Sequence, residues 1–569
     1  METGNQGSPE RTLCVCFAMP ETREPITLPE GYYLDNFRLL IDFVLQHHGD
    51  TLTMAEQRFR EDFLQLPRDA QRLYVRLAGR VGPYFRSDKL HYSEINDLPD
   101  QAAHLVEKGF LANDPELGIL DLLQLLNKDE VAALFRDDLQ DIPRGSKAEW
   151  TARLYDQYDE ETDALDRFHP QRSFQVYRVN HLDILQVYRL LFFGNLYQDL
   201  TEFVLLDLGL YRYADYSIDP TANPFRERHV LEQYFLLYDL YTRAWEIHET
   251  RTFKAYDELV VQIPVPFDHS RLIRLHGKLV NAIARDYERL ERDVDALDLY
   301  ATTAEAPSRE RRVRILYRLG RSGEAATLCR RIARKPVNEA EREFSMRFLP
   351  RLDSNLPKPS RFKPVTEDLL VTDSGERVEI QARDALAAAG WDAHYVENLL
   401  FMALYGLVFW DEIFAPIDGA FFNAFQAGPA DLFTPQFYQR RENMLERRLA
   451  WIRSGRFTSD WLQRQFTAKQ GINTPFINWR HLNVDLLNQA VEIIQPDHLA
   501  IIFQRLSFDL RTNRSGFPDL VLFKPAEKTY RLVEVKGPGD RVQDNQRRWL
   551  RAFHENGIPY EVLNVTFTQ

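Results

Sequence analysis

The chain has 569 residues, of which 44% are hydrophobic, so it exceeds the usual size of one core and predicts two to four domains. Its three cysteines include no CxxC pair, which excludes a disulfide framework or a structural zinc site and favours a reducing compartment. A net charge of −14 excludes a uniformly cationic nucleic-acid binder, because binding a polyanion needs basic surface.

The first segment, residues 1–114, predicts a helical domain. Residues 56–66 and 68–77 carry apolar side chains at helical spacing, and residues 102–110 resemble the recognition end of a winged-helix unit. That unit would provide packing and contact with a DNA backbone, and structural support alone is the alternative. The first eleven residues lack the apolar region of a signal peptide, and no run of eighteen apolar residues follows. We therefore expect an intracellular protein without a membrane partner, in the cytoplasm or nucleoid if it is bacterial.

Residues 115–172 predict a small DNA-binding module. Apolar residues form a two-helix pattern over 122–139, and Pro143-Arg144-Gly145-Ser146-Lys147 then leads into a third helix. This order resembles a SAP-type DNA-binding domain. Arg144 and Lys147 would hold a phosphate of duplex DNA at the helix start without reading its sequence, and a plain helical linker is the alternative.

Residues 173–357 predict a helical-repeat domain. The segment 314–333 indicates two helices joined by a turn that contains Gly320 and Gly323, and it resembles a tetratricopeptide-type repeat. Such a domain presents a surface to a protein partner, which the sequence does not identify. Upstream, three arginines open one helix and are candidates for binding a 5′ terminal phosphate, with an ordinary solvated basic face as the alternative. These arginines are Arg309, Arg311 and Arg312.

The last segment, residues 358–569, contains the most informative pattern. Asp519 is followed by fourteen residues and then by Glu534, Val535 and Lys536. The surrounding apolar runs predict a β-hairpin. Because side chains two apart share one face of a strand, Glu534 and Lys536 must project together, and the neighbouring strand can place Asp519 beside them.

This pattern favours hydrolysis of phosphodiester bonds. Mg²⁺ and Mn²⁺ take oxygen ligands, so Asp519, Glu534 and the backbone oxygen of Val535 are candidate metal ligands. Lys536 would hold or help to deprotonate the attacking water, or would balance charge on phosphorus. A bound ion lowers the pKa of its water and offsets charge on the phosphate. An ordinary exposed hairpin with a Glu–Lys pair is the alternative.

The residues after the hairpin favour the nuclease interpretation. A turn at 537–540, apolar residues at helical spacing up to Asn556, and a strand at 560–565 predict the order strand, strand, helix, strand. That order is the core of restriction-endonuclease-like folds. Gln546 is the polar member of the helical stripe, so we interpret it as a catalytic contact to phosphate or water, or else as a satisfied core amide.

Residues 514–522, 532–541 and 546–550 closely resemble the VRR-NUC nuclease domain. Upstream, residues 394–414 look like the segment that supplies a metal-binding glutamate, here Glu397, in the Fanconi-associated nuclease family. Family members usually have Gly where this chain has Asn398. From its own residues alone, Glu397 would rather be interpreted as a cap of the buried helix predicted for the apolar run that follows it.

The resemblance implies a multidomain, mainly α protein with a C-terminal α/β restriction-endonuclease-like domain of the PD-(D/E)xK type. It implies a structure-selective DNA nuclease that uses two divalent ions, Mg²⁺ or Mn²⁺, on branched or 5′-flap DNA. Such an enzyme cuts near 5′ flaps, degrades DNA from 5′ ends and acts in repair of interstrand crosslinks. One alternative is a DNA-binding scaffold without activity, against which the intact Asp519, Glu534 and Lys536 argue. Another is a Holliday-junction resolvase, against which the long helical regions argue.

Basic residues concentrate in the nuclease half of the chain. Between Arg505 and Glu555 there are eleven Lys or Arg residues and seven Asp or Glu residues, which answers the objection that the whole chain is acidic. Within this stretch we predict Arg514 and Arg541 as contacts to DNA, in addition to the basic residues named above.

Overall fold

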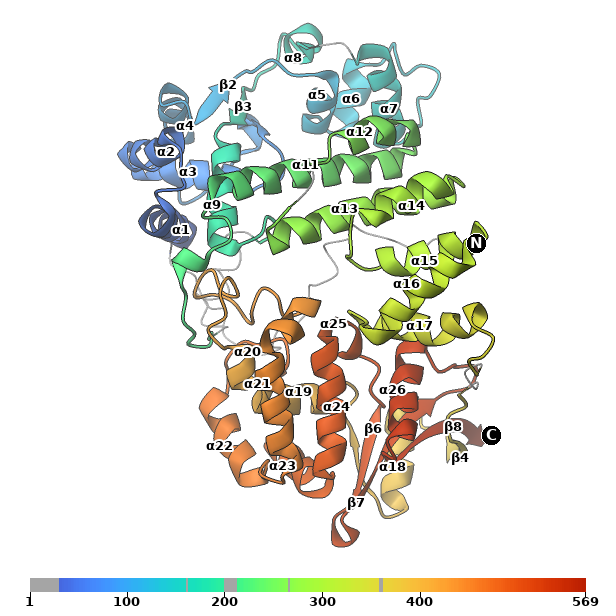
Figure 1. The fold of residues 1–569 in the computed structure, drawn as a ribbon. Coiled ribbons are helices and arrows are strands. Elements are labelled where there is room, and N and C mark those ends of the chain that lie inside the picture. Colours follow the sequence, from blue (N-terminus) through green and yellow to red (C-terminus); the bar gives the residue numbers. More distant parts are fainter. Residues whose placement is uncertain (1–29, 160–161, 199–211, 265–266, 358–361, 569) are drawn as a thin grey trace. The chain divides into compact units, whose positions relative to one another are not determined.

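The computed structural model describes residues 30–159, 162–198, 212–264, 267–357 and 362–568 (Figure 1). The chain divides into two compact units, residues 1–210 and 211–569, which are described separately below. The first 29 residues of the predicted N-terminal domain lie outside the described part. Within that part, no helix combines the length and apolar character needed to cross a membrane.

The first unit consists of short helices and a three-stranded sheet. Its elements are α1 (Tyr32–His48), α2 (Met54–Gln65), α3 (Arg68–Ala78), β1 (Tyr84–Arg86), η2 (Ser87–Lys89), α4 (Leu98–Glu107), β2 (Leu111–Asn113), α5 (Ile119–Leu125), α6 (Lys128–Leu134), α7 (Lys147–Tyr158), α8 (Ala164–Phe168), β3 (Val176–Val179) and α9 (Leu182–Phe193). The two helices predicted at 56–66 and 68–77 are confirmed as α2 and α3. Aromatic rings of Phe63, Tyr74 and Phe110 pack between them.

The sheet of the first unit has the order β1-β3-β2, and both pairings are antiparallel. Strand β3 follows the module predicted for residues 115–172, so that module is inserted between two strands of one sheet. The structure therefore differs from the predicted division at residue 173, because that division separates β3 from the two strands that provide its hydrogen bonds.

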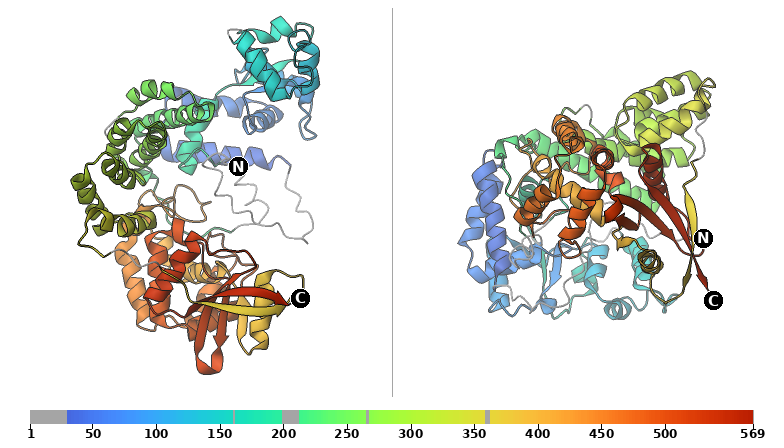
Figure 2. Two further views of the ribbon diagram at one scale, coloured as in Figure 1. Left: turned by 90° about the vertical axis from the view of Figure 1, so that its right-hand side faces the viewer. Right: turned by 90° about the horizontal axis from the view of Figure 1, so that it is seen from below.

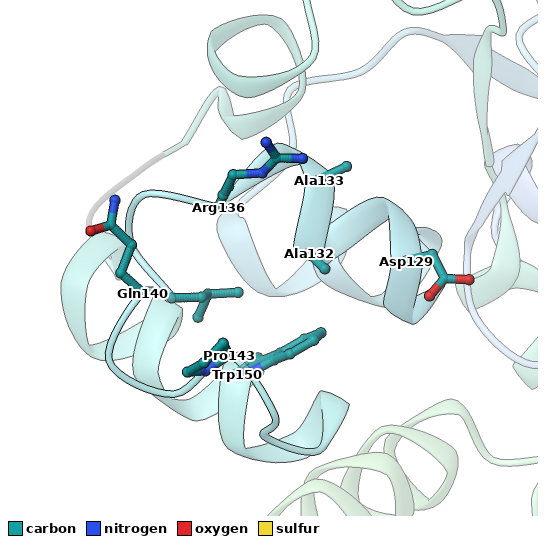
Figure 3. Close-up of a pocket in the computed structure, with 8 residues that line it drawn as sticks. Asp129, Ala132, Ala133, Arg136, Gln140, Pro143 and Trp150 are labelled. Carbon is teal, nitrogen blue, oxygen red and sulfur yellow. The ribbon is translucent and has the colours of Figure 1, made fainter.

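The inserted module has its own small core, which includes Leu122, Val131, Phe135 and Trp150. Helix α7 begins with a capping box in which Ser146 and Glu149 satisfy each other's backbone N–H groups. A cavity of about 680 Å³ lies between α6 and α7, with the Trp150 side chain on its wall (Figure 3). It contains none of the predicted nuclease residues, so this cavity is not the site of the predicted chemistry.

The second unit begins with helices that pack one after another. They are η3 (Pro220–Ala222), α11 (Arg228–Thr250), η4 (Phe253–Ala255), α12 (Tyr256–Val261), α13 (Ser270–Arg289), α14 (Asp293–Ala301), α15 (Ser308–Arg318), α16 (Ser322–Arg334) and α17 (Glu339–Leu352). From α13 to α17 each helix contacts the next, as a helical repeat requires (Figure 1). The helix pair predicted at 314–333 is confirmed as α15 and α16, and Gly320 in the turn has the positive φ of 76° that favours glycine.

The remainder of the second unit is an α/β fold. Its elements are β4 (Thr366–Thr372), α18 (Val378–Ala388), β5 (Asp392–Tyr395), α19 (Leu399–Val408), α20 (Trp410–Ile413), α21 (Pro435–Arg453), α22 (Ser459–Lys469), α23 (Val484–Ile493), α24 (Pro496–Phe508), α25 (Leu510–Asn513), β6 (Leu520–Lys524), η5 (Pro525–Glu527), β7 (Thr529–Lys536), α26 (Asp544–Glu555) and β8 (Tyr560–Thr568). The predicted order strand, strand, helix, strand is confirmed as β6, β7, α26 and β8. The helix predicted from 399 to 410 is confirmed as α19, which is buried.

These strands form one mixed sheet in the order β4-β8-β7-β6-β5. The pairs β4–β8 and β8–β7 are parallel, whereas β7–β6 and β6–β5 are antiparallel. Strands β4 (yellow) and β8 (dark red) lie side by side near the C-terminus (Figure 2). Side chains alternate between two cores. Leu520, Val533 and Val535 face α18, and Val521 and Leu532 face the larger helical core on the other side. The fold is thus mainly α with a C-terminal restriction-endonuclease-like sheet, as predicted.

Candidate active site

The sheet register brings the predicted hairpin residues together. Leu520 of β6 pairs with Val533 of β7, so the next step along both strands places Asp519 opposite Glu534. On the other side Tyr395 of β5 pairs with Leu520, and the Asp519 carbonyl oxygen accepts from the N–H groups of Val396 (2.9 Å) and Glu397 (3.0 Å). Asp519 therefore lies between the two strands that carry the other predicted carboxylates.

The loop before Asp519 is held by packing against α26. Phe517 stacks on Trp549 with ring centroids 4.1 Å apart. Gly516 has a φ of 91°, and a Cβ atom there would lie 2.8 Å from the backbone of Asn545. Only glycine fits this close approach, so the Gly-Phe-Pro-Asp sequence fixes where the strand begins.

The two hairpin carboxyl groups are both removed from water. Burial raises the pKa of Asp519 to about 6, although the Val535 N–H donates to its Oδ2 at 2.8 Å. Glu534 is 0% exposed, and burial together with the charge of Asp519 raises its pKa to about 8. At neutral pH and without a cation, Asp519 is mainly ionised and Glu534 mainly protonated.

Lys536 projects on the same face as Glu534, as the strand period predicted. Its Nζ lies 2.6 Å from Glu534 Oε1, and its side chain is 12% exposed. The Lys536 ammonium therefore favours the ionised form of Glu534, but it does not offset the effect of burial.

Glu397 stands directly after β5 with an exposed side chain and a φ of 42°. Its Oε2 accepts from the Tyr395 hydroxyl at 3.0 Å and its Oε1 from Asn398 Nδ2 at 3.2 Å. These partners are side chains rather than N–H groups of α19, so the alternative role as a helix cap has no hydrogen bond to support it. The site retains Glu397 beside Asp519 through the backbone bonds described above.

Sequence reasoning missed a fourth carboxylate. Glu379 lies in the first turn of α18, and its charge contributes to the raised pKa values of both Asp519 and Glu534. Arg377 reaches Glu379 at 3.5 Å and also donates to the Tyr395 hydroxyl at 3.1 Å. A glutamate in a first helical turn is common because the helix dipole favours it, so its pattern carried no separate signal. The available clue was that Glu379 belongs to the helix that, together with the following strand, leads to Glu397.

The donors present fit a hard divalent cation. Carboxylate and carbonyl oxygens are the ligands that Mg²⁺ and Mn²⁺ prefer, and Glu534 offers a buried carboxyl group whose Oε2 has no hydrogen-bond partner among the described residues. Among the described residues, no three His, Cys, Asp or Glu side chains already converge as a complete ligand set. Binding therefore requires carboxylates such as Glu397 to turn toward a shared ion.

Gln546 lies in the first turn of α26, where its side chain accepts from the Gln543 N–H at 2.8 Å as part of a capping box. The structure thus gives its Oε1 atom a structural partner. Its predicted contact with phosphate or water stays a prediction.

The inserted module holds Arg144 and Lys147 differently. Arg144 is exposed, whereas Lys147 Nζ donates to the Leu126 carbonyl oxygen at 2.6 Å. The capping box also occupies the backbone N–H groups of Ser146 and Glu149 at this helix start. Phosphate binding by Lys147 would require it to leave its present partner.

The three arginines of α15 are largely engaged inside the protein. Arg309 donates to Glu341 at 2.8 Å, and Arg311 donates to Glu288 at 2.7 Å. Arg312 has a buried Nε without a partner, and burial lowers the pKa of its guanidinium. The ion pairs give Arg309 and Arg311 structural roles, and a 5′-phosphate role for the three stays a prediction.

The two arginines predicted near the hairpin differ in exposure. Arg541 is exposed, whereas Arg514 is half-buried and lies 4.7 Å above the Phe433 ring. Burial and the neighbouring charge of Arg511 lower the pKa of Arg514. Contacts of either arginine with DNA stay predictions.

Two family models match this chain. Residues 458–567 match the VRR-NUC domain, and residues 31–112 match the FAN1 HTH domain. The first match contains the hairpin carboxylates and Lys536, and the second covers the N-terminal helices and strands β1 and β2.

The chain is also similar to complete proteins. The Fanconi-associated nuclease 1 homolog of Pseudomonas aeruginosa is 36% identical over 550 residues, which cover 95% of this chain and 96% of that protein. Human Fanconi-associated nuclease 1 is 24% identical over 95% of this chain and 63% of its own length. A crystal structure of paFAN1 bound to 2nt 5′ flap DNA with a gap matches with a TM-score of 0.83 and 36% identity, covering 95% of this chain and 100% of that one.

Proposed function

This chain belongs to the Fanconi-associated nuclease family, and we propose that it hydrolyses phosphodiester bonds of branched DNA near 5′ flaps. As a member it is a DNA nuclease that depends on divalent metal. The proposal adds exonuclease action from 5′ ends and a role in repair of interstrand crosslinks. One observation carries it: the register places Asp519 opposite Glu534 and Lys536 in a chain 36% identical to a protein crystallised with 5′ flap DNA.

Two Mg²⁺ or Mn²⁺ ions would be held by Glu397, Asp519, Glu534 and the backbone oxygen of Val535. When bound, they lower the pKa of coordinated water and offset negative charge on the phosphate oxygens. Within the chain, Glu534 must lose its proton before it can act as a ligand. The Lys536 ammonium, 2.6 Å from Glu534 Oε1, would hold the attacking water or balance charge on the phosphate.

The DNA would be held through its backbone by exposed cations. Arg144 and Arg541 meet this condition as they stand. Lys147, Arg309 and Arg311 would first have to exchange their internal partners for phosphate. Such contacts position a duplex without reading its sequence, which suits an enzyme that selects shape.

The test compares four substrates of equal length and sequence: a 5′ flap, a 3′ flap, a four-way junction and a linear duplex, each with Mg²⁺ or Mn²⁺. We expect the 5′ flap to be cut fastest. Preference for the four-way junction would favour a resolvase, and no cleavage of any substrate would favour a scaffold. Asp519→Ala serves as the matched control against a contaminating nuclease.

A further inference from the structure

The backbone of Glu397 is fixed independently of its side chain. Its N–H and that of Val396 both donate to the Asp519 carbonyl oxygen, which ties the end of β5 to the start of β6. Its φ of 42° lies in the left-handed region, which is unfavourable for a residue with a long side chain. The backbone therefore sets where the glutamate stands, but not where its carboxylate points.

The carboxylate is oriented by two neutral side chains. The Tyr395 hydroxyl donates to one oxygen and the Asn398 amide to the other, at 3.0 Å and 3.2 Å. Because each carboxylate oxygen has two lone pairs, one donor on each still leaves a lone pair on each for a cation. A charged donor such as lysine would compete with the cation, whereas these two donors do not.

Tyr395 and Asn398 each accept a further hydrogen bond that fixes their orientation. Arg377 donates to the Tyr395 oxygen at 3.1 Å, which directs the hydroxyl proton toward Glu397. Asn398 Oδ1 accepts from the Phe517 N–H at 3.3 Å. That N–H can only donate, so it fixes the amide with its NH₂ group toward the carboxylate. Asn398 thereby links Glu397 to the loop that carries Asp519.

We propose that Tyr395 and Asn398 are positioning residues that hold the Glu397 carboxylate for metal ligation, a proposal that rests on the proposed function. Groups that orient a metal ligand typically change metal affinity by about 10- to 100-fold when they are removed.

The test measures Mn²⁺ binding to the full chain by titration calorimetry without DNA, together with 5′-flap cleavage. We expect Tyr395→Phe and Asn398→Ala each to weaken Mn²⁺ binding about 10-fold or more, and cleavage to recover at high Mn²⁺. In a Glu397→Gln background the same substitutions should have no further effect on Mn²⁺ binding, because the carboxylate they orient is gone. If Tyr395 and Asn398 had a purely structural role, their substitution would still weaken Mn²⁺ binding in the Glu397→Gln background.

Matched controls come from the same sheet. Tyr560→Phe removes a hydroxyl that accepts from the Val365 N–H, and Asn564→Ala removes an amide that donates to Asp368. Neither should alter Mn²⁺ binding. Thermal unfolding in chelator shows whether each variant is folded, and Asn398→Gly replaces Asn398→Ala if the latter is not.

The outcomes separate the two proposals. If Glu397→Gln binds Mn²⁺ as tightly as the natural chain, the proposed ligand set is wrong and positioning falls with it. If Glu397→Gln weakens binding while Tyr395→Phe and Asn398→Ala do not, only the positioning role is overturned.

Discussion

Glu534→Gln is the substitution that most directly tests the electrostatics of the site. The natural carboxyl group is fully buried and has a pKa of about 8, far above its ordinary value of 4.5. A glutamine of the same shape has no proton to lose. We therefore expect the variant to lose cleavage and yet to be more stable than the natural chain at alkaline pH without metal.

The sign follows from proton binding. A carboxyl group whose pKa is raised on folding binds its proton more tightly in the folded state, so stability falls as pH rises. For Glu534 this loss occurs between about pH 4.5 and pH 8. A shift of this size corresponds to on the order of 5 kcal/mol in full, of which about 3 kcal/mol is lost between pH 5 and pH 7.5. Asp519 titrates in both proteins, so the difference between their pH dependences of stability reports the titration of Glu534.

Scanning calorimetry of the full chain in chelator, at pH 5 and at pH 8, measures the effect on the transition that includes the nuclease sheet. The two proteins should melt together at pH 5. At pH 8 the variant should melt roughly 7–14 °C higher, because about 3.5 kcal/mol is lost between pH 5 and pH 8 and each kcal/mol shifts the melting temperature by about 2–4 °C for a domain of this size. The reasoning is refuted if both proteins show the same dependence of melting temperature on pH.

Glu341→Gln is the matched control. Glu341 is also buried, but it accepts hydrogen bonds from the guanidinium of Arg309. Removing its charge leaves that cation without its partner, so the control should be destabilised at both pH values. A gain in stability there would mean that any buried glutamate behaves as Glu534 does.

Three further predictions concern metal and catalysis. Asp519→Ala should abolish metal-dependent cleavage of a 5′ flap while DNA binding in a mobility-shift assay survives; full activity would remove Asp519 from the site. Lys536→Ala should slow single-turnover hydrolysis far more than it weakens Mn²⁺ binding, and equal losses would make the lysine structural. Binding of Mn²⁺ at pH 7 should release about one proton from Glu534, measured by calorimetry in two buffers of different ionisation enthalpy, and the release should fall toward zero at pH 9.

The sequence predicted the hairpin correctly because the information is local. Alternation of side chains fixes that Glu534 and Lys536 share a face, and a short turn leaves few registers in which Asp519 can pair. The apolar run after Glu397 likewise specifies a buried helix. In these segments the local pattern and the tertiary structure agree, so the pattern of adjacent residues was sufficient to predict the structure.

The features that the sequence could not indicate depend on residues distant in the chain. Arg311 pairs with Glu288 and Lys147 donates to the Leu126 carbonyl oxygen, whereas phosphate binding by either residue stays a prediction. Strand β3 completes a sheet begun more than sixty residues earlier, which no local pattern indicates. Glu379 acts on Asp519 and Glu534 only after α18 packs on the sheet.

The same strand explains why an unfavourable carboxyl group is retained in the core. Glu534 shares its face with Leu532, whose side chain packs in the larger helical core, and it alternates with Val533 and Val535 in the opposite core. Turning Glu534 out of the site by a one-residue slip would move all three apolar side chains to the wrong faces. Burial of those side chains thus holds the carboxyl group where its pKa is raised, and a divalent cation is the ligand that relieves this condition. The stability lost without metal and the affinity gained with it therefore have one structural origin.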